Sequence, residues 1–402
     1  MSDTPTLIIH PREGTPDITD TPQQLQQAAI RLARSHMPVA VDVERASGYR
    51  YFETAYLVQI RREDVGTFLI DSHALADLSG LNPALGNAVW VLHAADQDLE
   101  SLRMAKLQVP AVFDTEVAAQ LLGYEQIGLA AVCERALGVT LDKDHQRSDW
   151  SRRPLPHAWL RYAALDVELL TALQNHLGNA LYEQGRWEWA EQEFDYILNQ
   201  PPKPSDPNRW RTFKGAGKVE GRRHLAVLRE LWNTRESVAR EHDIAPTRLI
   251  SNATLVRLAL KPPRNKRALL SIQAMRRPRT RKYTAQWLSA LMRARSLSDT
   301  DLPPRRLKHP HGFVPKAGSW RGSRPEAFAR LQRVRAIVNT HAKQLQVDPI
   351  RLLEPRVQRA LAWDEVAFSE PEFEQYMLRL QARPWQVEQV GAQIHAAIVN
   401  AV

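Results

Sequence analysis

The sequence predicts a mixed α/β domain followed by two small all-α domains. Short β-branched runs alternate with helical patterns over roughly the first half of the 402 residues. Four prolines then fall within residues 201–207, which is typical of a linker. Beyond them only helical patterns follow, in two blocks that share one plan. We therefore expect domains at 1–198, 218–297 and 324–402, with linkers at 199–217 and 298–323.

The first domain begins with a helix and a three-stranded meander. Thr21 is placed as a helix cap, with Pro22 in the first turn and Gln24 three residues after the cap, and the helix runs to about residue 35. The expected meander strands are 38–44, 55–61 and 65–71. A strand at 88–93, a helix at 97–106 and a strand at 110–114 follow, and then a helical pattern at 115–196 with an interruption near 141–156.

Each helical block starts with a long helix, followed by a loop with a proline-containing cap at Pro246 or Pro349 and by shorter helices. We read them as two copies of one small helical domain. The expected helices are 222–242, 249–260, 268–272 and 283–295 in the first block, and 325–345, 350–361, 372–380 and 384–399 in the second.

Charge is divided unequally along the chain. Residues 1–200 hold 16 Lys and Arg against 28 Asp and Glu, a net charge of −12, whereas residues 201–402 hold 38 against 17, a net charge of +21. An Arg-rich composition would explain Arg in place of Lys, but it would not explain this segregation. The asymmetry therefore favours a polyanionic partner such as a nucleic acid.

Other classes of protein are excluded by simple counts. We find no apolar run near the ~18 residues that a membrane-spanning helix needs, so no membrane partner is expected. The first ten residues lack the features of a secretory signal. Cys133 is the only cysteine, so neither an intramolecular disulfide nor a thiolate zinc cluster can form. A reducing cytoplasm is the expected location.

Two acidic residues lie in the first expected strand. Asp42 and Glu44 are two positions apart, which places both side chains on the same face of the strand. Because the strand is otherwise apolar, it should be buried, and two buried like charges require a neutralising cation. The pair therefore suggests a metal site. The alternative is an edge position with one face in water.

Three further residues are individually weaker signals. Asp98 lies just past a strand end, where sites form in open α/β sheets, but considered alone it is better explained as a cap of the following helix, a role that Asp96 could also fill. Tyr162 and Asp166 are four positions apart, hence on one side of a helix, although a tyrosine can simply pack and an aspartate can face solvent. Four carboxylates without Cys or clustered His favour hard cations, Mg²⁺ or Mn²⁺, over zinc.

Taken together, Asp42, Glu44, Asp98, Tyr162 and Asp166, in this order and context, resemble the signature of the DEDDy family of 3′–5′ exonucleases. The run Arg-Ser-Asp-Trp-Ser-Arg-Arg-Pro at 147–154 and the run Tyr-Ala-Ala-Leu-Asp-Val at 162–167 are similar to ribonuclease D, and the likeness covers about residues 35–195. The first helical block, with Leu-Ile-Ser-Asn-Ala-Thr-Leu at 249–255, resembles the HRDC domain, and the second resembles a divergent copy.

The resemblance implies an RNase H-like mixed-sheet domain followed by two HRDC-type domains, with two divalent metal ions in the site. It implies that Asp42 bridges both ions, that Glu44 and Asp166 complete one and Asp98 supports the other, and that Tyr162 orients the nucleophilic water. The implied activity is 3′–5′ exoribonuclease trimming of tRNA precursors and other small structured RNAs, with release of nucleoside 5′-monophosphates. A DNA-directed exonuclease and a non-catalytic nucleic-acid binding module are the alternatives, and protein partners stay unknown.

Basic loops of the second half are the candidate RNA-binding surface. Trp320 and Tyr283 are available there for base stacking, and the alternative for each basic run is a solvated loop. The candidate nucleic-acid-binding residues are Arg276, Arg277, Arg279, Arg281, Lys282, Arg305, Arg306, Lys308 and Trp320.

Overall fold

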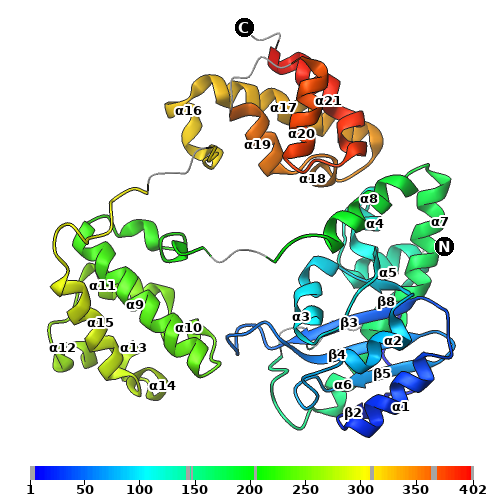
Figure 1. The fold of residues 1–402 in the computed structure, drawn as a ribbon, viewed down its shortest axis with the longest axis horizontal. Helices are drawn as coiled ribbons and strands as arrows, with labels where there is room; N and C mark the ends of the chain where they lie inside the picture. The colour runs from blue at the N-terminus through cyan, green and yellow to red at the C-terminus, as the bar shows by residue number, and fades with distance from the viewer. Residues whose placement is uncertain are drawn as a thin grey trace.

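The computed structural model describes residues 5–141, 145, 148–202, 206–307, 312–363 and 369–399 (Figure 1). A six-stranded mixed sheet, ordered β2-β5-β4-β3-β6-β7, forms the framework of the first domain. The strands of this sheet are β2 (Ile18–Thr19), β3 (Val39–Arg45), β4 (Ala55–Arg62), β5 (Gly66–Ile70), β6 (Val89–Leu92) and β7 (Ala111–Asp114). β3, β4 and β5 form the predicted antiparallel meander, and β6 and β7 add parallel strands on the other side of β3.

β3 is an interior strand because it pairs with β4 on one side and with β6 on the other. Its apolar residues Val39, Val41 and Val43 are buried, as the run of β-branched residues predicts. A second sheet of two short parallel strands, β1 (Thr6–Ile8) and β8 (Val139–Leu141), was not predicted as a pair. β8 falls at the start of the expected interruption.

Helices cover the larger sheet. α1 (Pro22–Leu32) begins with the predicted capping box between Thr21 and Gln24, and it ends three residues earlier than expected. α6 (His157–Glu168) packs across β3, β4 and β5, so any side chain on its sheet-facing side lies close to β3. The other helices of the domain are α2 (Asn82–Leu85), α3 (Leu99–Met104), α4 (Thr115–Leu121), α5 (Leu129–Leu137), α6 (His157–Glu168), α7 (Leu170–Glu183) and α8 (Trp187–Leu198).

The two helical blocks share the order of their first helices. A helix of 20 or 21 residues is followed by one of 4 and one of 9 residues in each block. The first block consists of α9 (Arg222–Glu241), α10 (Pro246–Leu249), α11 (Asn252–Leu260), α12 (Lys266–Leu270), α13 (Gln273–Arg276), α14 (Pro278–Arg281) and α15 (Thr284–Ser296). The second consists of α17 (Pro325–Leu345), α18 (Pro349–Leu352), α19 (Pro355–Trp363), α20 (Glu370–Arg379) and α21 (Pro384–Val399), preceded by α16 (Trp320–Ser323).

The basic stretch at 276–282 is not the loop that the sequence predicted. It is folded into the end of α13 and the whole of α14, because Pro278 starts a helical turn and the Thr280 side chain donates a hydrogen bond to the Leu249 carbonyl. The two expected linkers also carry short helical turns, at Arg209–Arg211 and Ala216–Lys218 in the first and at Ala317–Ser319 and α16 in the second.

The helical blocks contact the first domain at different places. The second block shares one continuous apolar core with it, and in Figure 1 this block lies against α8 and α4. The first block instead contacts the β3–β4 hairpin: the Asp243 carboxylate accepts hydrogen bonds from the backbone N–H groups of Tyr51 and Phe52, at 3.0 and 3.2 Å. Across the described residues, no helix has both the length and the hydropathy to cross a membrane.

Candidate active site

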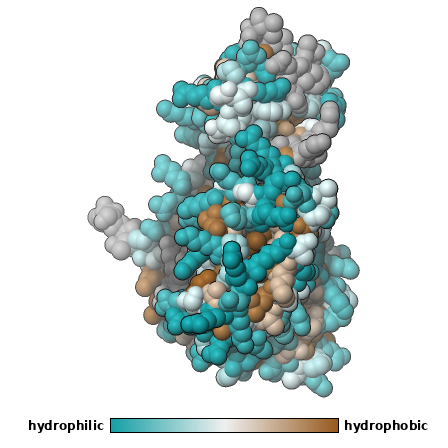
Figure 2. Space-filling view, turned by 90° about the vertical axis from the view of Figure 1, so that its left-hand side faces the viewer, coloured by the Kyte–Doolittle hydropathy of each residue, from teal (hydrophilic) through white to brown (hydrophobic). Residues whose placement is uncertain are grey.

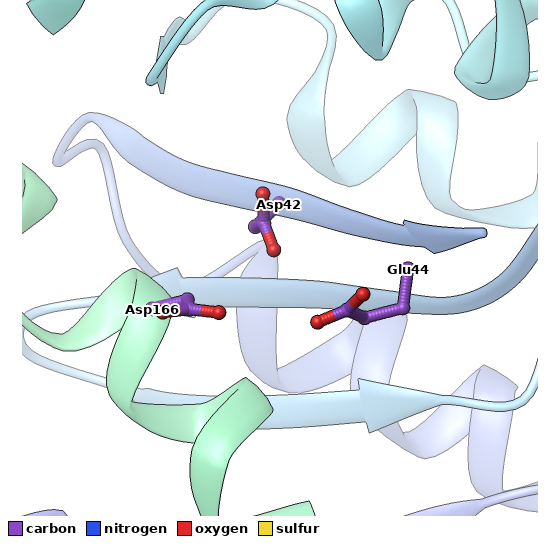
Figure 3. A group of neighbouring side chains, drawn as sticks. All are labelled: Asp42, Glu44 and Asp166. Atoms are coloured by element: carbon purple, nitrogen blue, oxygen red, sulfur yellow. The ribbon is translucent and has the colours of Figure 1, made fainter. Parts of the chain in front are cut away.

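Three carboxylates meet over the central strand. Asp42 and Glu44 project from the same face of β3, as their spacing of two predicts, and Asp166 reaches them from α6 (Figure 3). One oxygen from each of the three side chains lies within 4.8 Å of the other two. The edge-strand alternative for Asp42 and Glu44 is therefore wrong, since β3 lies inside the sheet and Glu44 is buried.

Asp98 faces the same cavity from the start of α3. Although it occupies the N-cap position, its side chain accepts no hydrogen bond from the helix backbone, so the capping interpretation of Asp98 is wrong. Its carboxylate instead lies 3.4 Å from the Arg45 guanidinium. Asp98 stands outside the group of three, and its buried side chain faces the cavity with Arg45 as its ion-pair partner.

Tyr162 is one turn before Asp166 on α6, and its hydroxyl is close enough to the Asp166 carboxylate to oppose the rise in the pKa of that group that burial causes. The ring is buried, and Trp150 packs beside it with ring centroids 6.4 Å apart. Trp150 belongs to the segment that precedes α6. This packing fixes the phenol at the edge of the cavity, where its hydroxyl can contact a molecule that enters.

An ion pair anchors the segment before α6 to the sheet. Arg153 donates two hydrogen bonds to Asp71, both of 2.6 Å, and a third to the Tyr56 carbonyl. Asp71 directly follows β5, and it also accepts two backbone N–H groups of the next turn. Because α6 starts four residues after Arg153, this ion pair helps to set the position of Tyr162 and Asp166 relative to β3.

The four carboxylates are buried close to one another, and both burial and repulsion act on their charges. Burial raises the pKa of all four, and mutual repulsion raises those of Glu44, Asp98 and Asp166 further. Asp42 is the strongest charged neighbour of each of these three. Arg45 is the cation that opposes the repulsion, and it acts on Asp42, Glu44 and Asp98.

All four acidic side chains and Tyr162 line one cavity of about 320 Å³. Its potential metal ligands are carboxylate oxygens, which suit hard divalent cations. His93 also lines the cavity, but one ring nitrogen is hydrogen-bonded to the Thr115 hydroxyl at 2.9 Å, and burial lowers the pKa of His93 to about 4. It is therefore neutral near pH 7.

Asp114 is a structural residue of the site for which the sequence predicted no role. Its buried carboxylate accepts backbone N–H groups from Ala94 and Ala95, and it also caps α4 through Glu116 and Val117. It therefore holds the β6–α3 connection, which carries Asp98, against the end of β7. The position of Asp114 at a strand end before a helix was the available signal.

The expected RNA-binding residues divide into two groups. Five residues of the first block and two of the following segment are exposed: Arg276, Arg277, Arg279, Arg281, Lys282, Arg305 and Arg306. Figure 2 shows that this side of the molecule is largely hydrophilic. Trp320 and Tyr283 are buried in the cores of the two blocks, so the prediction that they stack on bases is wrong. Lys308 lies outside the described residues.

Comparisons with protein families agree with this architecture. Residues 16–182 match the family described as 3′-5′ exonuclease, residues 224–291 match the HRDC domain, and residues 313–398 match a family described as 3′ to 5′ exonuclease C-terminal domain. The second block thus matches a family model of its own, although its first helices follow the same order as those of the first block.

Solved structures with the same fold cover nearly the whole chain. A protein from Bifidobacterium adolescentis is 35% identical, with a TM-score of 0.89 over 98% of this chain and 99% of its own. Escherichia coli RNase D shares the fold at 21% identity, with a TM-score of 0.70 over 96% of this chain and 99% of its own.

The fold and the family matches define a 3′–5′ exonuclease. Ribonuclease D of Granulibacter bethesdensis is 32% identical over 66% of this chain and 68% of its own length, and that of Pseudomonas paraeruginosa is 30% identical over 92% and 94%. The chain therefore belongs to the ribonuclease D family, and it is a 3′–5′ exoribonuclease. The resemblance found in the sequence is confirmed.

Proposed function

We propose that the chain removes nucleotides from the 3′-hydroxyl end of RNA by metal-dependent hydrolysis, and that it releases nucleoside 5′-monophosphates. The observation that supports this most directly is the convergence of Asp42, Glu44, Asp98 and Asp166 on one cavity, with the Tyr162 hydroxyl beside them. Buried carboxylates at this density require cations, and their oxygen atoms favour Mg²⁺ or Mn²⁺.

The four carboxylates would hold two divalent ions. Two such ions, when bound, supply a clamp for the attacking and leaving oxygens of a phosphodiester displacement. Asp42 is the proposed shared ligand, as the family resemblance implies; it belongs to the group with Glu44 and Asp166, and its charge also acts on Asp98. Asp166 and Glu44 offer oxygens within 4.8 Å of one another and of Asp42, and Asp98 lies outside this group beside Arg45.

Tyr162 is proposed as the residue that orients the nucleophilic water. Burial and the neighbouring acids raise the pKa of its phenol, so the hydroxyl keeps its proton near pH 7. A neutral phenol has one O–H donor and two lone pairs, so the Tyr162 hydroxyl can both donate toward the neighbouring Asp166 carboxylate and accept a hydrogen bond from water. Tyr162 therefore acts by orientation, and it does not act as a general base.

The proposed substrates are tRNA precursors and other small structured RNAs. The exposed basic residues of the first block support a polyanionic substrate longer than the nucleotides inside the cavity. Escherichia coli RNase D, which shares the fold, is described as an exoribonuclease involved in structured RNA processing. DNA remains a second candidate substrate, and the cytoplasmic location stays a prediction.

The test uses matched RNA and DNA oligonucleotides with a 3′-hydroxyl, and the same RNA with a 3′-phosphate as the control. We expect stepwise shortening of the 3′-hydroxyl RNA with Mg²⁺ or Mn²⁺, nucleoside 5′-monophosphate as product, and no reaction with EDTA. Hydrolysis that persists in EDTA would contradict the metal-dependent site. Faster digestion of DNA than of RNA would favour the DNA-directed alternative.

A further inference from the structure

Arg45 directly follows Glu44 on β3. It is not one of the five residues of the exonuclease signature, which therefore gives it no role. Strict strand alternation would direct its side chain away from the face of Asp42 and Glu44. At this point, however, the register between β3 and β4 slips by one residue, so that Glu44 pairs with Leu57 and Arg45 pairs with Ala55. Such irregularities increase the local twist and redirect side chains beside active sites.

The Arg45 guanidinium is held at the cavity by two partners. One terminal nitrogen lies 3.4 Å from the Asp98 carboxylate, and the other donates to the Gln97 carbonyl. The side chain of Asp98 is 6% exposed and that of Arg45 is 22% exposed, so the pair is largely shielded from water. At this depth an ion pair is much stronger than one on the surface, and removal of either charge leaves the other unpaired.

Asp98 differs in this respect from the other three acidic residues. Asp42, Glu44 and Asp166 group closely enough to share an ion, whereas Asp98 lies outside that group beside the guanidinium. Asp98 caps no helix, so its side chain has no structural task at the start of α3 that would explain its burial.

We propose that Arg45 is the internal counter-ion of Asp98, which stabilises this carboxylate before metal is bound and must be displaced when a divalent ion binds there. The inference rests on the proposed metal-dependent function. Metal binding at Asp98 should then be weaker than at the group of Asp42, Glu44 and Asp166, because the Arg45 ion pair is with Asp98, whereas Arg45 acts on Asp42 and Glu44 without an ion-pair contact in the described structure. Arg45 is thus a positioning residue for Asp98.

Mn²⁺ binding without RNA tests this directly. Arg45→Gln keeps an amide that can donate to the Gln97 carbonyl, and it removes only the charge. Arg103→Gln on α3 is the matched control, since Arg103 ion-pairs with Glu100 at 3.8 Å and donates to the Leu198 carbonyl, away from the cavity. Each protein is titrated with Mn²⁺, and free ion is followed by electron paramagnetic resonance. The melting temperature of each metal-free protein is measured in parallel.

We expect Arg45→Gln to bind the weaker of two Mn²⁺ ions about tenfold more tightly than the unaltered protein, or more, because a competing charge is gone. Arg103→Gln should leave that affinity unchanged, and Arg45→Lys should lie between. The metal-free Arg45→Gln protein should melt at a lower temperature than the unaltered protein. Mn²⁺ should raise its melting temperature by a larger amount. If it does not fold, Arg45→Lys still reports the trend.

Unchanged Mn²⁺ affinity in Arg45→Gln and Arg45→Lys, with the unaltered protein binding two ions, would overturn the role of Arg45 and leave the metal centre intact. An equal gain in the Arg103→Gln control would also overturn it, because the effect would then be one of general charge. A failure of the unaltered protein to bind Mn²⁺ would contradict the proposed function and this inference together.

Discussion

The Glu193 carboxylate of α8 binds the Arg383 guanidinium, although the two residues are 190 positions apart. The donor–acceptor distances are 2.6 and 3.1 Å, and Arg351 and the Trp385 indole N–H donate to the same fully buried carboxylate at 3.2 and 3.0 Å. The second helical block is therefore joined to the nuclease domain through a buried charge with several partners. Deletion of residues 201–402 would expose the Glu193 carboxylate. Point substitutions are therefore a better test of RNA binding by the basic residues of 201–402 than deletion of that segment.

Glu193→Gln should destabilise the protein by about 3–5 kcal/mol, because it leaves two largely buried guanidinium groups without their shared charge. Urea unfolding followed by circular dichroism measures the loss. The control is Arg223→Ala, which removes the exposed ion pair with Asp299 and should cost less than about 1 kcal/mol. Equal losses of unfolding free energy in the two variants would show that Glu193 does not stabilise the contact between the second block and the nuclease domain.

The Asp71–Arg153 ion pair should make stability depend on pH in the acid range. Burial alone would raise the pKa of Asp71, but the hydrogen bonds from Arg153 and from two backbone N–H groups outweigh it and lower the pKa below its usual value of 3.8. A lowered folded-state pKa stabilises the protein fully above the unfolded value, and the contribution is lost as the pH falls through the folded value.

The free energy of unfolding of the unaltered protein and of Asp71→Asn should therefore differ by a constant amount above about pH 5 and converge below pH 4. Denaturant unfolding curves of both proteins between pH 2 and 7 measure this difference in free energy. A gap that widens as the pH falls would contradict the assigned shift.

Much of the fold follows from local patterns in the sequence. The capping box at Thr21, the β-branched run of β3 and the prolines that open α17 and α21 all act within a few residues, so their structures could be predicted. The two-residue spacing of Asp42 and Glu44 works in the same way, because strand alternation alone places both on one face.

The features that were missed depend on contacts between distant residues. The burial of Trp320 reflects packing of α16 against α17 and Trp363, which composition around the tryptophan cannot indicate. The positions of Arg45 beside Asp98 and of Arg383 beside Glu193 are set by tertiary packing. No periodicity in the sequence predicts which charged residues form these ion pairs.

Replacement of the five basic residues at 276–282 by glutamine should weaken RNA binding and reduce its salt dependence, because fewer counterions are released. On single-stranded RNA the slope of log affinity against log salt should decrease by about 0.7 for each lost phosphate contact. Hydrolysis of a dinucleotide is the internal control, and its rate should stay unchanged. An unaltered slope on a tRNA-sized RNA would show that the exposed surface of α13 and α14 does not contact the substrate.

Tyr162→Phe removes the hydroxyl and keeps the ring, so the packing with Trp150 is preserved. If the hydroxyl orients water, the single-turnover rate should fall by about 10²–10⁴-fold with little change in RNA affinity. Tyr182→Phe is the matched control, since Tyr182 is exposed and stacks on Trp187. A Tyr162→Phe protein with an unchanged single-turnover rate would show that Tyr162 serves packing alone.

The single-turnover rate of the folded Asp42→Asn protein on a 3′-hydroxyl RNA, with saturating Mg²⁺, tests the metal-dependent site most directly. Asparagine has almost the same volume, and it removes one of four mutually repelling charges, so circular dichroism and the melting temperature should report an intact or more stable fold. We expect hydrolysis to be abolished, because Asp42 interacts with every other carboxylate of the site. Retention of more than about a few per cent of the activity by a folded Asp42→Asn protein would contradict it.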